Sequence, residues 1–105
     1  MKIITNKIIE EVCREFGISR TEINQKSRVR HITIARSIAC WLIDKHNAEN
    51  SVRGIARHFE GIGEHAVYNC LKNVSNWAEF DSYLKKKIAR IESNLNIEKI
   101  LEAFA

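Results

Sequence analysis

The chain has 105 residues, of which 45% are hydrophobic and 29% are charged. This length fits one domain with a modest core, and no apolar run reaches the roughly 18 residues that a membrane span needs. Seventeen Lys and Arg against thirteen Asp and Glu give a net charge of +4, which suits an anionic partner without demanding one. Because the start of the chain also lacks the apolar core of a signal peptide, we expect a cytoplasmic protein.

Cysteine and histidine usage argues against a metal site, a disulfide scaffold and catalysis. The three cysteines lie far apart, with no Cys-x-x-Cys pair, and the four histidines show no metal-ligand spacing. No nucleophile stands in a pattern with a base, and no phosphate-binding loop of the form Gly-x-x-x-x-Gly-Lys-Ser/Thr occurs. We therefore expect no cofactor, no bound nucleotide and no enzymatic activity.

Apolar residues spaced three and four apart, in a chain without proline, predict an all-α fold. A first helix is expected from about Thr5, acting as its N-cap, to Phe16. Residues 18–23 have room for a short helical turn that begins at Ser19 or Thr21.

A polar and basic stretch, residues 24–30, is expected to form a loop. Five basic residues and a single acid lie between positions 20 and 36. The most apolar helix is predicted after the loop, over residues 32–46, with Ile34, Ile38, Trp41 and Leu42 as its stripe. This helix is expected to form the centre of the core.

Residues 51–74 are the most informative segment. Ser51 is expected to cap a short helix over residues 51–59, and Gly61 and Gly63 permit a tight turn. On the helix that follows, the apolar spacing directs five hydrogen-bonding side chains to the outer face: Glu64, His65, Tyr68, Asn69 and Lys72. Two helices joined in this way form a helix-turn-helix, whose second helix can lie in the major groove of DNA.

A further amphipathic helix is expected from about Trp77. Its predicted stripe is apolar and regularly spaced: Phe80, Leu84, Ile88, Ile91 and Leu95. A last apolar face is expected between residues 97 and 104. We interpret residues 1–77 as a DNA-binding domain and residues 78–105 as a C-terminal helical extension, which either packs back onto the domain or forms a homodimer.

The order of these segments resembles the C-terminal DNA-binding domain of the bacterial replication initiator DnaA. The resemblance lies in the basic loop at 25–30, the run Ala35-Arg36-Ser37-Ile38-Ala39, the turn Glu60-Gly61 and the helix at 65–74. It covers roughly two thirds of the chain. It implies a TrpR-like helical bundle with a helix-turn-helix, here followed by the C-terminal extension, in a chain too short to hold the family's ATPase domain.

The resemblance implies DNA contacts by the basic residues of the loop and by Arg36, while helix position and groove chemistry indicate the other contacts. The predicted backbone contacts are all basic: Lys26, Arg28, Arg30, Arg36, Arg53 and Lys72. The predicted base-reading residues lie on the second helix: Glu64, His65, Tyr68 and Asn69. Asn69 has the geometry to bond adenine, and Glu64 to accept from cytosine. An ordinary solvated helix surface is the equal alternative for this face.

The base-reading motif departs from the family pattern. Gly63-Glu64-His65-Ala66 stands where the family has Asp-His-Thr-Thr, and Ile62 replaces an arginine. We predict double-stranded DNA binding, sequence-specific, in the control of replication initiation or transcription, by a bacterial or phage-encoded protein associated with the nucleoid. The alternative is a protein-interaction module that keeps the scaffold and no longer reads bases.

Overall fold

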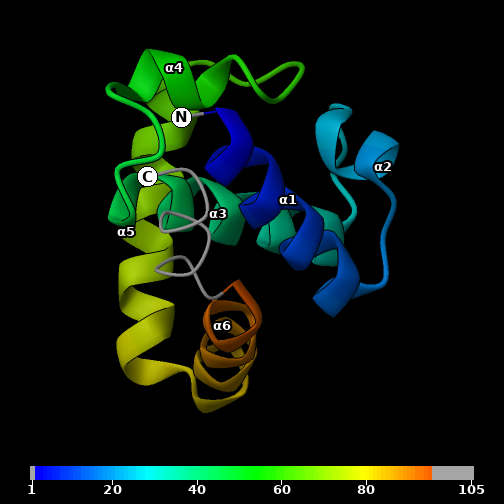
Figure 1. Ribbon diagram of the computed structural model, residues 1–105, viewed down its shortest axis with the longest axis vertical. Helices are drawn as coiled ribbons and strands as arrows, with labels where there is room; N and C mark the ends of the chain where they lie inside the picture. The colour runs from blue at the N-terminus through cyan, green and yellow to red at the C-terminus, as the bar shows by residue number, and fades with distance from the viewer. Residues whose placement is uncertain (1, 96–105) are drawn as a thin grey trace.

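The computed structural model describes residues 2–95, which form six α-helices and no β-strand (Figure 1). The helices, in chain order, are α1 (Lys2–Phe16), α2 (Arg20–Asn24), α3 (Arg30–Lys45), α4 (Val52–Ala56), α5 (Glu64–Phe80) and α6 (Ser82–Leu95). The all-α prediction is confirmed. The apolar face predicted at residues 97–104 lies outside the described residues. None of the helices in residues 2–95 combines the length and the apolar character needed to cross a membrane.

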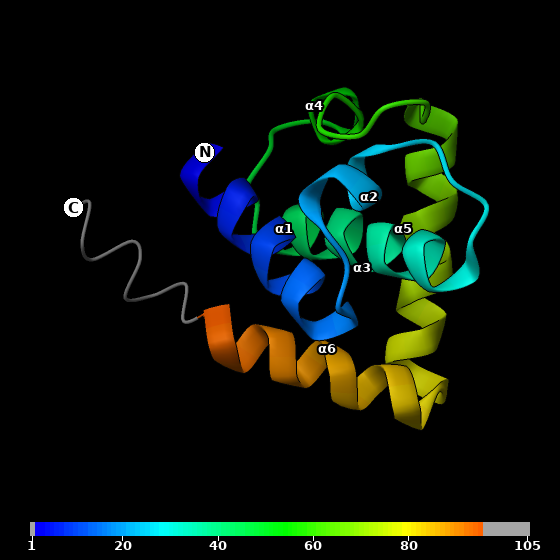
Figure 2. The same ribbon diagram turned by 90° about the vertical axis from the view of Figure 1, so that its right-hand side faces the viewer.

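Helix α3 is the centre of the fold, as its apolar composition predicts. It packs against α1 on one side and α5 on the other, and these are the two most extensive helix contacts in the structure (Figures 1 and 2). Ile38, Leu42 and Ile43 of α3 are completely buried. Burying a side chain of this size contributes about 1.5–3 kcal/mol, so the α1–α3–α5 packing supplies much of the core.

Two helices begin earlier than their sequence patterns predict. α1 already begins at Lys2, so Thr5 lies inside the helix rather than capping it. Its side chain is buried and its hydroxyl donates to the carbonyl of Ala48 at 3.4 Å. α3 begins at Arg30, which therefore belongs to a helical turn and not to the preceding loop. Apolar periodicity marks the buried face of a helix and not its first residue, so the predicted starts fall two or more residues late.

The short helix α2 begins as one of the two predicted alternatives requires. Ser19 is its N-cap, and the hydroxyl of Ser19 accepts from the amide of Glu22 at 3.0 Å. The carboxylate of Glu22 in turn accepts from the amide of Ser19 at 3.0 Å. This capping box satisfies two amides that the first turn would leave unpaired.

A break at Asp81 divides the helix that was predicted to run on from Trp77. α5 continues to Phe80, Asp81 is extended, and its carboxylate accepts from the amide of Leu84 at the start of α6. Because Phe80 and Leu84 lie on different helices, the prediction that Phe80 joins the apolar stripe is wrong. Phe80 is 79% exposed, whereas the rest of the predicted stripe is buried: Leu84, Ile88, Ile91 and Leu95.

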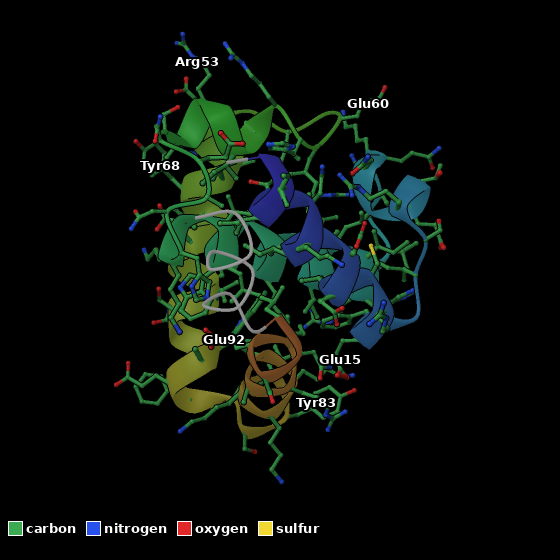
Figure 3. All side chains as sticks on the ribbon, viewed as in Figure 1. Glu15, Arg53, Glu60, Tyr68, Tyr83 and Glu92 are labelled. Carbon is green, nitrogen blue, oxygen red and sulfur yellow. The ribbon has the colours of Figure 1, made fainter. Side chains whose placement is uncertain are left out.

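Helix α6 packs back onto the domain. Its buried side chains belong to the same core cluster as those of α1 and α3. Glu15 of α1 accepts from Arg90 at 3.0 Å and lies 3.7 Å from Lys87, and Figure 3 shows Glu15 and Tyr83 together at this contact. The boundary predicted after residue 77 falls inside the continuous helix α5. Residues 82–95 therefore share one core with the helices that precede them.

Candidate nucleic-acid interface

The short helix α4 and the longer α5 form the predicted two-helix unit. The hydroxyl of Ser51 accepts from the amide of Gly54 at 3.0 Å, which confirms Ser51 as the N-cap of α4. Ile55 and Phe59 are almost fully buried and anchor this part of the chain in the core. α4 ends at Ala56, three residues before the predicted end, and turns lead from there to α5.

The connection between the two helices requires glycine at position 61. Gly61 has a φ of +79°, which L-residues rarely adopt. A Cβ at this position would also lie 2.8 Å from the Cβ of Lys26. Gly63 differs, because its φ is −107° and a Cβ there would meet nothing within 4 Å. The turn is therefore closed by Gly61 and packs directly against the segment that carries Lys26.

Helix α5 presents a polar outer face, as predicted. Val67 and Val74 are completely buried on its inner side. Five side chains on the opposite side are exposed and together are called the outer face of α5: Glu64, His65, Tyr68, Asn69 and Lys72. Tyr68 is 60% exposed and projects away from the core (Figure 3). Four of the five are the predicted base-reading residues, and the structure brings them together on one helix surface.

Residues 25–29, called the basic loop, connect α2 to α3 and pack against the turn before α5, where Lys26 meets Gly61. Lys26 and Arg28 are exposed, and Arg30 is exposed at the start of α3. The amide of Val29 donates to the hydroxyl of Ser27 at 3.1 Å, which shapes the end of the loop. Three predicted backbone-contacting cations are thus available to solvent beside the two-helix unit.

Arg53 and Glu64 were predicted to contact DNA separately, but the structure pairs them. The Nε of Arg53 lies 3.8 Å from a carboxylate oxygen of Glu64, and both side chains are mostly exposed. An exposed ion pair of this kind contributes less than about 1 kcal/mol to stability. It does place a positive charge beside the carboxylate that would otherwise repel phosphate at the start of α5.

Arg36 occupies a different kind of position from the other predicted backbone contacts. Its side chain is only 6% exposed. Its Nε donates to the carbonyl of Ile23 at 3.0 Å, and a terminal nitrogen donates to the carbonyl of Gln25. The guanidinium therefore supports the basic loop from beneath instead of reaching the surface. The sequence signal for this burial is spacing, since Ile32 and Ala39 lie on the same stripe of α3.

Two thiols, those of Cys40 on α3 and Cys70 on α5, meet between these helices, and the sequence did not predict this pairing. The hydroxyl of Ser37 donates to the sulfur of Cys70 at 3.2 Å. A hydrogen bond from Cys40, followed by that from Ser37, lowers the pKa of the Cys70 thiol to about 6. The same Cys70 interaction, with burial, raises the pKa of Cys40 well above its usual value. Ser37 and Cys40 lie one turn apart, but only the packing of α5 shows that Cys70 meets them.

We expect Cys70 to be alkylated by iodoacetamide with a rate that rises through about pH 6 and levels off above it, because the thiolate is the reacting form. Cys13 and Cys40 are buried with raised pKa values, so they should react much more slowly at neutral pH. Mass spectrometry of peptides after brief labelling measures each site. The variant Cys70→Ser should lose the fast phase, and a Cys70 profile centred near pH 9 would contradict the expectation.

These features define a helix-turn-helix protein: a short capped helix, a turn closed by glycine, and a second helix with one buried face and one exposed polar face. Residues 5–74 match the family described as the bacterial DnaA protein helix-turn-helix, and the chain belongs to this family.

The chain is similar to chromosomal replication initiator proteins DnaA from several bacteria. It is 33% identical over 98 residues to that of Nautilia profundicola, a match covering 92% of this chain and 22% of the relative. It is 30% identical over 95 residues to that of Sphingopyxis alaskensis, covering 90% and 21%. It is 32% identical over 94 residues to that of Bacteroides thetaiotaomicron, covering 89% and 20%. The chain thus spans about a fifth of the length of these relatives. No solved structure matches it.

Proposed function

We propose that the chain binds double-stranded DNA and acts in replication initiation. The observation that carries the proposal is the contact between the basic loop and the turn that leads into α5, where Lys26 meets Gly61. This contact holds the loop cations near the start of the helix that carries the outer face. Family membership supports the same function, because the named relatives are replication initiators.

In the proposed complex, the outer face of α5 enters the major groove, as the second helix of a helix-turn-helix does. Lys26, Arg28 and Arg30 contact phosphates from the basic loop and the adjacent turn of α3. Lys72 reaches the backbone from α5. Phosphate contacts set the orientation on the duplex, while base contacts by His65 and its neighbours would select sequence.

The proposed binding is sequence-specific, in control of replication or of transcription, but the target differs from the family's own. His65, Tyr68 and Asn69 are all exposed on α5 and carry groups that can bond base edges. Glu64 lies beside Arg53, which offsets the charge that would repel the phosphates of the groove. The departures at residues 62–66 from the family's base-reading motif support a different preferred sequence.

Fluorescence anisotropy with a random-sequence duplex at several salt concentrations tests the proposal. Four phosphate-contacting cations should give a slope of log affinity against log salt of about −3.6, since each contact contributes about −0.9. Selection from a random duplex pool then identifies the preferred sequence. Failure to bind any duplex at low salt would overturn the proposal.

We expect Asn69→Ala and His65→Ala to relax sequence preference while leaving non-specific affinity nearly unchanged. Each lost base contact should reduce discrimination by about 1–3 kcal/mol. The measurement compares affinity for the selected duplex and for the random duplex in the same buffer. Asn94→Ala on α6 is the matched control, because it removes an exposed amide far along the chain from the interface. Equal losses on both duplexes would show that these side chains contact the backbone.

A second candidate function is a protein-interaction module, including a homodimer. The observation that favours it is the exposure of two aromatic side chains where α5 meets α6: Phe80 is 79% and Tyr83 66% exposed. Exposed aromatics of this size are enriched at protein interfaces. Absence of duplex binding in the anisotropy experiment would favour this candidate.

A further inference from the structure

Arg36 carries a buried positive charge on α3. Its neighbours on the same stripe, Ile32, Ala35 and Ala39, are all buried. Among residues 2–95 no carboxylate forms a salt bridge with it; the guanidinium is instead bonded to the carbonyls of Ile23 and Gln25. A buried charge is costly unless its hydrogen bonds are made. The position of Arg36 therefore depends on these two carbonyls, and theirs on Arg36.

The carbonyl of Asn24, which lies between those of Ile23 and Gln25, accepts a hydrogen bond from a different part of the chain. The amide of Glu60, in the turn before α5, donates to the carbonyl of Asn24 at 2.8 Å. Three successive carbonyls, at residues 23–25, are thus bonded in alternation by Arg36 of α3 and by Glu60 of the turn. Carbonyls at the end of a helix lack partners within the helix, so α2 supplies the acceptors that join these two elements.

The cations of the basic loop follow these carbonyls directly. Lys26 follows Gln25, and its Cβ, Cγ and Cδ all lie close to the place where a side chain on Gly61 would stand. Two interactions therefore fix the start of the loop: the hydrogen bonds of the buried Arg36 and the packing of residues 60–61. Residue 60 lies only four positions before the first residue of α5. The position of the loop cations therefore depends on the turn that leads into α5, the helix that carries the outer face.

We infer that Arg36 is a positioning residue for DNA binding. It sets the register between the basic loop and the outer face of α5, so that both meet one duplex at the same time. This inference rests on the proposed function and goes further. In it, Arg36 makes no phosphate contact itself but positions Lys26 and Arg28, which do. A side chain that is 6% exposed and bonded to two carbonyls is placed for this action and not for direct contact.

A double-mutant cycle separates positioning from direct contact. Arg36→Met removes the donors and keeps much of the side-chain length, and Lys26→Ala with Arg28→Ala removes what Arg36 is inferred to position. Arg36→Met should weaken low-salt binding to a random duplex roughly tenfold or more, since Lys26 and Arg28 would be displaced and lose their charge-assisted hydrogen bonds to phosphate. In the chain lacking both loop cations, Arg36→Met should cause little further loss, because coupled residues are not additive.

Arg36→Lys is the conservative variant and keeps the charge with a donor for one carbonyl. It should recover part of the lost affinity, and it serves in the cycle if Arg36→Met does not fold by circular dichroism. Full additivity, with the salt slope reduced by a further 0.9 or so in the chain without loop cations, would show a direct phosphate contact and overturn the inference. Unchanged affinity in a folded Arg36→Met chain would overturn it as well.

Hydrogen exchange tests the same inference without DNA. In Arg36→Met the amide of Glu60 should exchange faster than in the wild type, because its acceptor at Asn24 is no longer held in place. Amides of α6, such as that of Ile91, should be unaffected. Unchanged protection of Glu60 would overturn the inference. If the wild type binds no duplex but Glu60 responds as expected, the proposed function fails while the link between loop and turn stands.

Discussion

Gly61→Ala is expected to destabilise the protein by about 2 kcal/mol and to weaken DNA binding. Alanine at a φ of +79° carries a strain of roughly 1–2 kcal/mol. The added Cβ would also approach the Cβ of Lys26 to 2.8 Å, so the basic loop must move away from the turn. Chemical denaturation measures the free energy of unfolding, and anisotropy on a random duplex measures the effect on the interface.

Two other glycines provide controls that separate strain from contact. Gly17 has a φ of +65° and open space around it, so Gly17→Ala should cost only the strain, about 1 kcal/mol, and leave DNA affinity intact. Gly63 has neither positive φ nor a close neighbour, and Gly63→Ala should cost less than about 1 kcal/mol as the N-cap of α5. Equal destabilisation by all three substitutions would show that the contact with Lys26 is unimportant.

Removing Lys26 and Arg28 together should give the largest loss of DNA affinity of any surface change. Both side chains are exposed, so Lys26→Ala with Arg28→Ala should leave the free energy of unfolding within about 0.5 kcal/mol of the wild type. Affinity for every duplex should fall roughly tenfold to a hundredfold at low salt. The slope of log affinity against log salt should become less steep by about 1.8, the value for two phosphate contacts.

The matched control is Lys85→Ala with Lys86→Ala on α6. It makes the same change in net charge, from +4 to +2, and removes two exposed lysines away from the basic loop. If DNA binding depended only on net charge, both double variants would lose affinity equally. That result would contradict the assignment of the basic loop to the interface.

The sequence predicts the parts of the fold that depend on local patterns. Helical spacing of apolar residues predicts α1, α3 and α5, and the capping residues Ser19 and Ser51 mark the starts of α2 and α4. The exposed face of α5 follows from the same spacing, because the buried positions Val67 and Val74 leave the opposite side to solvent. The patterns are less informative about where a helix begins or breaks, as at Lys2, Arg30 and Asp81.

In the candidate site too, some features follow from local sequence patterns and others depend on tertiary packing. The identity of its exposed cations and polar groups is readable from the chain, because exposure on a helix face or in a polar loop is a local property. The burial of Arg36 is only partly readable, since its spacing places it on the apolar stripe of α3 but the two carbonyls that accept from it lie 11 and 13 positions away. The meeting of Ser37, Cys40 and Cys70 also depends on the packing of α5 against α3.

By itself, the sequence determined that this protein is an all-α helix-turn-helix with a basic loop and a polar outer face on its second helix. The tertiary structure decided that α6 shares the core, that Arg53 pairs with Glu64, and that Arg36 lies beneath the loop. The physical reason is the separation along the chain over which each interaction acts. Helix periodicity and capping act over a few residues, whereas Arg36 meets carbonyls 11 and 13 positions away and Glu60 bonds Asn24 across the intervening helices.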